Sequence, residues 1–168
     1  MEEAIYDIRV AMPEDVEQIN KNIKRTMVSP EGKAPRKGLR DAAVRRELLV
    51  LERYESKERA ARISAFIEWH ARVDGTVTIK DLGTAGDEPH TGMIKRIVRE
   101  LLHESSPPEA RVKLRADLIA WNSIFQDLPG FYLEGQEFSR PHWKNIWTWT
   151  PEAERRARGP RERGERRR

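Results

Sequence analysis

TVTIKDLGTAGDEPHTGMIKRIVRELLHE, residues 76–104, is the stretch of this sequence that decides its fold. It begins as a strand, because Val77 and Ile79 alternate with polar residues after an Asp-Gly turn. It ends as a helix whose apolar residues recur at helical spacing and form one buried stripe, namely Met93, Ile94, Ile97, Val98, Leu101 and Leu102. A loop rich in Gly, Asp, Thr and Pro lies between them at residues 83–91. A strand that enters a helix through such a loop leaves backbone N–H groups that can hold a phosphate.

The residues before this stretch predict further strands and helices. Alternation predicts strands at 6–10, 49–54 and 63–73, and helical spacing predicts helices at 13–24 and 39–48 with an exposed loop between them. In the third of these strands one face is expected to be core, and it carries Ile63, Ala65, Ile67, Trp69, Ala71 and Val73. A polar connection at 55–58 and the Asp-Gly turn join three successive strands, so we expect an antiparallel meander.

The residues after the central helix predict one more strand, a helix and a final strand pair. The strand at 112–118 follows a strand and a helix, so a right-handed parallel crossover is expected. A helix at 120–128 leads through a Pro-Gly turn into strands at 131–138 and 143–150. Trp143, Trp147 and Trp149 fall on one face of the last strand, and such spacing is more typical of a core than of a ligand cage.

Composition narrows the class of protein. The 168 residues suffice for one domain with a core, and 36% charged against 38% hydrophobic residues is typical of a globular protein. No segment approaches the roughly 18 apolar residues of a membrane helix, and the first residues lack signal-peptide features, so we expect the cytoplasm. The absence of cysteine excludes disulfides and thiolate metal sites, and the four histidines lack ligand spacing, so no metal is expected.

The net charge lies in a C-terminal tail. Residues 151–168 hold eight arginines and four glutamates and so account for the whole net charge of +4, which leaves the preceding residues balanced. Such a segment cannot bury a core, so we expect it to be largely disordered, or a frayed helix at its start. Its arginines can contact the phosphates of a nucleic acid, and a merely solubilising role is the alternative.

The order of these elements resembles the GCN5-related N-acetyltransferase (GNAT) superfamily over residues 5–150, as a divergent member. Three pieces are similar to family segments: IRVAMPEDVEQI, GMIKRIVREL and NSIFQDLPGFYLEGQEF. The resemblance implies an α/β (α+β) fold with a mixed, mostly antiparallel central sheet of about seven strands flanked by about four helices. It implies a GNAT-like acyltransferase domain at 1–150, followed by the Arg-rich tail at 151–168.

The resemblance also implies acetyl-CoA as the acyl donor. The family's phosphate loop has the form Q/R-x-x-G-x-G/A, in which Gly92 matches the first glycine, while Pro89 and Ile94 depart from the pattern. The Ile94 side chain either crowds the pyrophosphate or belongs to the core stripe of the helix. The residues that the resemblance assigns to the cofactor are Leu82, Thr91, Gly92, Met93, Ile94, Lys95 and Asn122, with Arg96 as an alternative source of positive charge.

Direct attack of an amine on the thioester is the mechanism that the resemblance implies, with the backbone of the fourth strand holding the carbonyl. Glu68, His70 and Asp81 are the candidate bases, and the first two share a strand face. The alternative for them is a solvated polar face, or a strand-end hydrogen-bonding role for Asp81. In the family a tyrosine often protonates the departing CoA thiolate, but Gln126 stands at that position here. Tyr132 or Ser123 is therefore the candidate for this general acid.

The function predicted on these grounds is acetyl transfer from acetyl-CoA to an amine of a small molecule or protein. The alternative is a binding module of the same fold that transfers no acetyl group and contacts nucleic acid or an acidic partner through its tail. A transferase with a different donor is a third interpretation. Exposed strand edges of the meander and of the final strand pair can pair with a second copy of the chain, so a homodimer is a further possibility.

Overall fold

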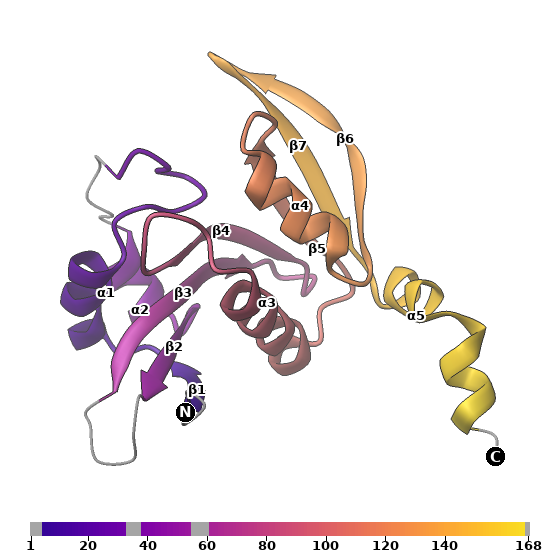
Figure 1. The fold of residues 1–168 in the computed structure, drawn as a ribbon, viewed down its shortest axis with the longest axis horizontal. Coiled ribbons are helices and arrows are strands. Elements are labelled where there is room, and N and C mark those ends of the chain that lie inside the picture. Colours follow the sequence, from indigo (N-terminus) through magenta and orange to yellow (C-terminus); the bar gives the residue numbers. More distant parts are fainter. Residues whose placement is uncertain (1–4, 33–37, 55–60, 167–168) are drawn as a thin grey trace. The chain divides into compact units, whose positions relative to one another are not determined.

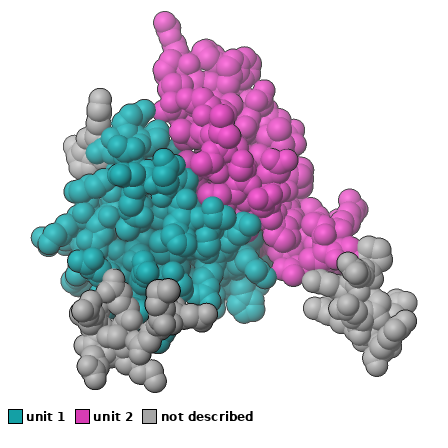
Figure 2. Space-filling view, viewed as in Figure 1, with its two compact units in different colours: residues 1–71, 79–106 teal, residues 72–78, 107–168 magenta. Residues whose placement is uncertain are grey.

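The structure is a computed structural model that describes residues 5–32, 38–54 and 61–166. Its contacts divide the chain into two compact units (Figure 2). Unit 1 comprises residues 1–71 and 79–106, and unit 2 comprises residues 72–78 and 107–168. The predicted boundary at residue 150 stays a prediction. In the described part of the chain, no helix has both the length and the apolar character that a membrane crossing requires.

Unit 1 holds the first three strands, most of the fourth, a 3-10 helix and the first three α-helices (Figure 1). Its strands are β1 (Ile5–Val10), β2 (Leu48–Tyr54), β3 (Arg62–Ala71) and most of β4 (Val77–Thr84), and they are ordered β1-β2-β3-β4. Its helices are the 3-10 helix Pro13–Asp15, α1 (Val16–Asn22), α2 (Leu39–Val44) and α3 (Thr91–Ser105). β2 pairs antiparallel with both β1 and β3, as the predicted meander requires.

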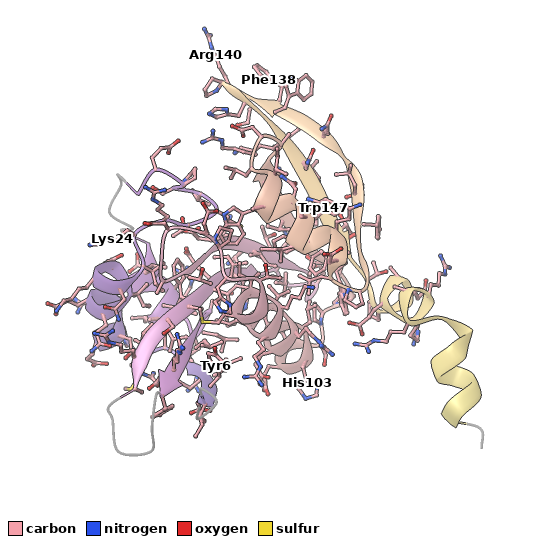
Figure 3. All side chains as sticks on the ribbon, in the orientation of Figure 1. Tyr6, Lys24, His103, Phe138, Arg140 and Trp147 are labelled. Carbon is pink, nitrogen blue, oxygen red and sulfur yellow. The ribbon has the colours of Figure 1, made fainter. Side chains whose placement is uncertain are left out.

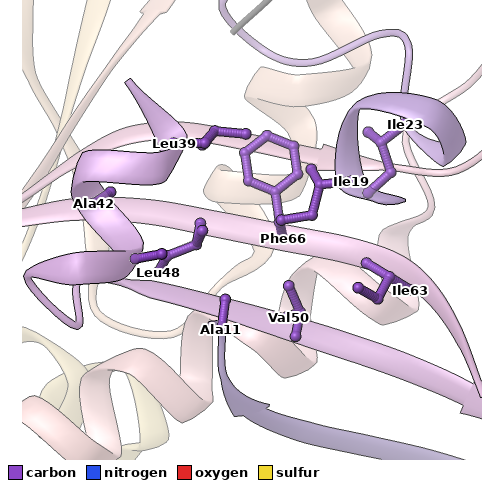
Figure 4. Close-up of a cluster of buried hydrophobic side chains, with 10 residues drawn as sticks. Ala11, Ile19, Ile23, Leu39, Ala42, Leu48, Val50, Ile63 and Phe66 are labelled. Atoms are coloured by element: carbon purple, nitrogen blue, oxygen red, sulfur yellow. The ribbon is translucent and has the colours of Figure 1, made fainter. Parts of the chain in front are cut away.

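Two helical layers bury the two faces of the unit 1 sheet. Figure 4 shows α1 and α2 packed over β2 and β3 through Ala11, Ile19, Ile23, Leu39, Ala42, Ala43, Leu48, Val50, Ile63 and Phe66. The six apolar side chains of the α3 stripe are all buried, and α3 contacts β2 and β3. Arg96, on the outer side of α3, lies over the Tyr6 ring at 5.1 Å from the ring centroid, which is a cation–π contact.

Unit 2 is built on three strands and two helices. β7 (His142–Trp149) lies between β5 (Ala110–Arg115) and β6 (Phe131–Ser139) and pairs antiparallel with both. α4 (Ile119–Asp127) packs on β6, where the Phe125 and Phe131 rings meet edge-on at 5.1 Å. The start of β4 also belongs here, and the Val77 N–H donates to the Glu109 carbonyl at 3.0 Å. β4 and β5 therefore begin side by side, as a parallel crossover requires.

The predicted fold class is confirmed, with five helices in place of about four. Three details of the sequence prediction were wrong. Leu48 begins β2 and does not end α2, because a turn at Arg45 and Arg46 breaks the helix first. Both faces of β3 are buried, since Phe66 is as inaccessible as its neighbours. Val73 lies in the turn after β3 and is fully exposed.

The chain's later segments also differ in part from expectation. β5 ends at Arg115, so Ala116 and Leu118 lie beyond it. Of the three aligned tryptophans, Trp147 and Trp149 are buried, but Trp143 is 56% exposed beside Phe138 near the β6–β7 hairpin end (Figure 3). The tail, for which disorder or a frayed helix was expected, forms helix α5 (Pro151–Arg166), interrupted by non-helical backbone at Gly159. The connection predicted at 55–58 lies outside the described residues.

A charged triad fixes the turn from β1 into α1. Arg9 donates two hydrogen bonds to Asp15, at 2.7 and 2.9 Å, and another to Glu52 on β2. Asp15 also accepts the Met12 N–H at 2.7 Å. The hydrogen bond from Arg9 lowers the pKa of Asp15, and it outweighs the opposing effect of burial.

We therefore expect Asp15→Ala to lower the free energy of unfolding by about 1–2 kcal/mol at neutral pH, because it removes a bidentate pair and a cap. Since the pKa of Asp15 is depressed in the folded state, this contribution exists above the unfolded pKa and disappears as pH falls through the folded pKa. Urea unfolding of both proteins from pH 7 to pH 2 measures it. Glu14→Ala, at an exposed neighbour, is the control and should change stability little at any pH. A pH-independent loss in Asp15→Ala would contradict this account.

Candidate functional site

The loop from β4 into α3 ends in a capped helix start. The His90 N–H donates to the Thr84 hydroxyl at 2.9 Å, which fixes the loop end against β4. His90 then caps α3 twice: its Nδ1 accepts the Met93 N–H at 3.1 Å, and its carbonyl accepts the Ile94 N–H at 3.0 Å. The amides of Thr91 and Gly92 have no hydrogen-bond partner within the described segments. Of the four backbone amides at residues 91–94, for which phosphate binding was expected, two are thus open at the positive end of the helix.

The side chains at this helix start separate into core and surface. Ile94 is fully buried and Met93 is 4% exposed, which favours the core-stripe interpretation of Ile94 over crowding of a phosphate. Gly92 is exposed, and a Cβ on it would meet only the His90 ring, at 3.3 Å from Cε1. Lys95 is half-buried one residue further on. The surface around the open amides is therefore unobstructed by side chains of the stripe.

The outer edge of β4 is occupied by the chain itself. The Ala85 N–H donates to the Ser64 carbonyl on β3 at 2.8 Å. Because the N–H and C=O groups of successive residues point to alternate sides of a strand, those of Thr84 and Leu82 point away from β3. There the Leu82 carbonyl accepts the Met27 N–H at 2.9 Å, and the Leu82 N–H donates to its neighbour Asp81 at 2.9 Å. Both backbone groups of this predicted cofactor residue are engaged.

We call residues 26–29 the strap, because they lie along this edge. Thr26 forms an isolated antiparallel bridge with Gly83, and the Val28 N–H donates to Asp81 at 3.4 Å. A turn stabilises the strap from within, since the Ser29 N–H donates to the Thr26 hydroxyl at 2.9 Å. Gly83 is required for this close approach, because a Cβ there would lie 2.9 Å from the Thr26 methyl carbon.

Glu68 and His70 lie near a buried carboxylate that the sequence analysis did not single out. Glu47 has a 12% exposed side chain and accepts the Ala71 N–H at 2.6 Å and Arg45 Nε at 2.9 Å. The His70 Nδ1 lies 3.5 Å from Glu47 Oε1. His70 is thus directed to Glu47. The Glu68 carboxylate lies beside Gly38, where a Cβ would be 3.7 Å from Glu68 Oε2.

The two glutamates of this cluster have opposite pKa shifts. Burial raises the pKa of Glu68, and the negative charges of Asp81 and Glu47 raise it further against the effect of nearby cations. Burial also raises the pKa of Glu47, but the bonds from Ala71 and its two basic neighbours outweigh it and lower the pKa overall. A carboxylate whose pKa is raised toward neutrality can accept a proton in a general-base step. Glu68 therefore fits that role better than its neighbour.

The other predicted site residues have structural partners or a different setting. Asp81 is 6% exposed and bonds the strap and Leu82, so it stabilises this edge of β4. Tyr132 is 42% exposed on β6 in unit 2. Ser123 is exposed on α4.

Asn122, predicted to bind the cofactor, is the centre of a hydrogen-bond network in unit 2. Its amide donates to the carbonyls of Arg115 and Leu118, at 3.0 and 2.8 Å. Its Oδ1 accepts Asn145 Nδ2 at 2.9 Å and Trp147 Nε1 at 2.8 Å, which ties α4 to β7. All of its hydrogen-bonding capacity serves the fold in this arrangement.

The strap, Glu47 and the His90 cap were not predicted from the sequence. Met27 and Val28 belong to a segment whose composition predicts only a loop, and no local pattern indicates that it pairs with a strand more than fifty residues away. No sequence motif marks Glu47 as a site residue either. His90 stands three residues before Met93, the first residue of the apolar stripe, but histidine is not among the preferred N-cap residues, so the sequence did not indicate the cap. Within the described residues, no group of acidic and histidine side chains could hold a metal ion.

No protein-family profile and no curated protein sequence matches the chain, whereas many solved structures do. An acetyltransferase of the GNAT family from Bacillus cereus matches 87% of this chain and 97% of its own, with a TM-score of 0.69 and 10% identity. The ribosomal-protein-S18-alanine N-acetyltransferase from Escherichia coli matches 87% and 94%, with a TM-score of 0.66 and 13% identity. A putative acetyltransferase from Salmonella typhimurium, solved with its cofactor acetyl-CoA, matches 87% and 94%, with a TM-score of 0.62 and 12% identity. At these identities the likeness establishes the fold, so the chain has the GNAT fold that the sequence resembled.

The opposite pKa shifts of the glutamates predict opposite effects on stability. Glu68→Gln should stabilise the protein at pH 7.5, because the folded state then no longer holds an ionised carboxylate whose pKa is raised. Glu47→Gln should lower the free energy of unfolding there by about 1–3 kcal/mol, because its hydrogen-bonded charge is lost. The Glu68→Gln difference should shrink as pH falls from 7.5 toward 4, because the raised pKa of Glu68 makes the folded carboxyl protonate first. The Glu47→Gln difference should largely persist to pH 4, because it disappears only as pH falls through the lowered folded pKa of Glu47. Thermal unfolding of the three proteins across this range tests the signs, and a destabilised Glu68→Gln at pH 7.5 would contradict the assignment.

Proposed function

We propose that this chain is an N-acetyltransferase that transfers an acetyl group from acetyl-CoA to an amine of a small molecule or protein. The support is the GNAT fold, together with the open amides of Thr91 and Gly92 at the start of α3, where the resemblance puts the donor's phosphates. Other GNAT-fold acetyltransferases have been solved with acetyl-CoA or CoA. The observation that carries the proposal is the pair of open amides.

The residues of unit 1 fit the donor's phosphates better than they fit its thioester arm. Thr91 and Gly92 would hold a phosphate through their N–H groups, and half-buried Lys95 would add positive charge. Leu82 would offer its backbone groups to the arm only after Met27 and Asp81 release them. When bound, acetyl-CoA supplies an acetyl group activated as a thioester. Release of the strap is therefore part of the proposed function.

Glu68 is the proposed general base. Its raised pKa suits it to take a proton from an ammonium acceptor and leave an amine. His70 would act through Glu47, which it faces at 3.5 Å, as a positioning residue. Asp81 would hold the strap and the Leu82 amide until the donor binds. Tyr132 stays the candidate acid for the departing thiolate.

Calorimetric titration of the protein with acetyl-CoA tests the donor site. We expect saturable binding that survives removal of residues 151–168 and weakens at least tenfold in Gly92→Trp, whose indole would cover the open amides. Gly135→Trp is the matched control, because a Cβ there meets nothing within 4 Å, and it should bind as the parent does. No binding, or binding that requires the tail, would refute the donor assignment.

The pH dependence of transfer tests the base. With an amine acceptor found by screening, kcat/KM should fall at acid pH, because Glu68 must be ionised to accept a proton. The midpoint of this fall should lie above the ordinary glutamate pKa, since burial raises that of Glu68. Glu68→Gln should lower kcat by about 100-fold or more and remove this limb. An unchanged acid limb in Glu68→Gln would assign the base elsewhere.

The second candidate is a binding module of the same fold that transfers no acetyl group. The engaged backbone of Leu82 and the saturated side chain of Asn122 favour it. Arg155 and Arg156 on α5 are exposed and would provide contacts to phosphates of a nucleic acid. The same titration separates the two candidates, because the module would give no heat with acetyl-CoA.

A further inference from the structure

The imidazole of His90 occupies one of the amides at the start of α3, where the proposed function puts the donor's phosphates. An α-helix begins with backbone N–H groups that have no partner inside the helix. In α3 these include the N–H groups of Thr91, Gly92 and Met93, since the Ile94 N–H already donates to the His90 carbonyl at 3.0 Å. Within the described segments Thr91 and Gly92 are open, whereas Met93 donates to His90 Nδ1 at 3.1 Å. The ring therefore takes one of three available donors.

The backbone of His90 is fixed, while its ring lies at the surface. The His90 N–H donates to the Thr84 hydroxyl at 2.9 Å, and Thr84 is 2% exposed, so this bond anchors the residue to the end of β4. The His90 residue itself is exposed. In the part of the chain that the structure describes, the bond to Met93 is the one hydrogen bond of the ring. Rotation about the Cα–Cβ bond of His90 can thus remove the ring from Met93 without moving the loop or the helix.

The ring also lies against Gly92. A Cβ on Gly92 would be 3.3 Å from His90 Cε1, a tight contact, and 3.6 Å from Nδ1. The imidazole therefore stands directly beside the residue whose amide is open. A phosphate that used all three amides would place an oxygen where Nδ1 now accepts the Met93 N–H. The phosphate and the ring in its present position exclude each other.

An anionic phosphate is a stronger acceptor for the Met93 amide than the imidazole. The imidazole accepts through Nδ1 only in its neutral form, and hydrogen bonds to charged acceptors are roughly twice as strong as those between neutral groups. The positive end of the helix also favours an anion over a neutral ring. A phosphate can therefore displace the ring.

We infer that His90 is a removable plug of the donor site, which holds the Met93 amide until a phosphate of the donor displaces the ring. The inference rests on the proposed function and concerns the regulation of that same site. In the free protein the plug satisfies the helix start without a ligand. Because displacement uses part of the binding energy, the contact is autoinhibitory and lowers the affinity for the donor. It is separate from the strap, which covers Leu82 and not the amides.

NMR of the full chain labelled with nitrogen-15 tests the plug. The hydrogen bond joins two nitrogens, so a scalar coupling between the Met93 amide nitrogen and His90 Nδ1 should be measurable in the free protein. Saturation with acetyl-CoA should abolish it. A coupling that is missing from the free protein, or one that persists in the saturated protein, would overturn the inference and leave the donor site standing. No binding of acetyl-CoA by the parent or by any His90 variant would refute the donor site and the inference together.

Two substitutions of His90 separate the plug from a general effect on the helix. His90→Ala removes the ring and frees the Met93 amide, so calorimetry should show acetyl-CoA binding about three- to tenfold more tightly, as expected for one net hydrogen bond. Its melting temperature should nevertheless fall, because the cap is lost. A residue that only stabilised the helix start would give weaker binding on removal.

His90→Asn keeps an acceptor atom close to the position of Nδ1, and asparagine is a preferred N-cap residue. This variant should therefore bind acetyl-CoA more weakly than His90→Ala. His103→Ala, at an exposed position in the last turn of α3, is the control and should bind as the parent does. Equal affinity of His90→Ala and the parent would show that the ring competes with nothing, and weaker binding by His90→Ala would make the ring a ligand of the phosphate. Either result would overturn the inference.

Discussion

The hydrogen bond from the Met27 N–H to the Leu82 carbonyl determines the state of the β4 edge. A strand edge holds a ligand through backbone groups that point outward, and here those of Leu82 are engaged by the strap and by Asp81. Each such bond contributes only about 0.5–1.5 kcal/mol net, so a ligand with matching donors and acceptors can replace it. The arrangement is therefore a closed form of the edge, held by a few weak contacts. Opening it would also expose the Met27 side chain, which is 3% exposed, so the bound donor would have to replace that packing as well as the hydrogen bonds.

The strap depends on glycine and on packing beneath it. Gly83 lets Thr26 approach β4, because any Cβ would collide with Thr26, Ile23 and the Phe66 ring. Ile23 and Phe66 are fully buried in the cluster beneath α1 and α2, so the base of the strap is rigid. Val28, by contrast, is 61% exposed. Thr26 and Met27 are buried, so Val28 is the one of these three strap residues that is not held by packing.

The fold was predictable from sequence because its elements have strong periodicity. The α3 stripe specifies a helix and its buried face, the alternation in β3 specifies a strand, and the turn before β4 specifies a hairpin; their order predicts the GNAT fold. The site was less predictable, because it depends on contacts between segments that are distant in the chain. Whether Ile94 packs inward, whether Asn122 is free and what covers Leu82 are decided by tertiary packing, which no local pattern encodes. His90 illustrates the limit, since a cap that uses an imidazole is chemically sound but uncommon.

Amide hydrogen exchange at Met27, with and without saturating acetyl-CoA, tests this account most directly. The Ala85 amide is the internal control, because it is bonded to Ser64 on the β3 side of the same strand. If the donor replaces the strap, Met27 exchanges slowly in the free protein and markedly faster in the saturated protein, while Ala85 stays equally slow in both. A Met27 amide that remains as protected in the saturated protein as in the free one would contradict the account.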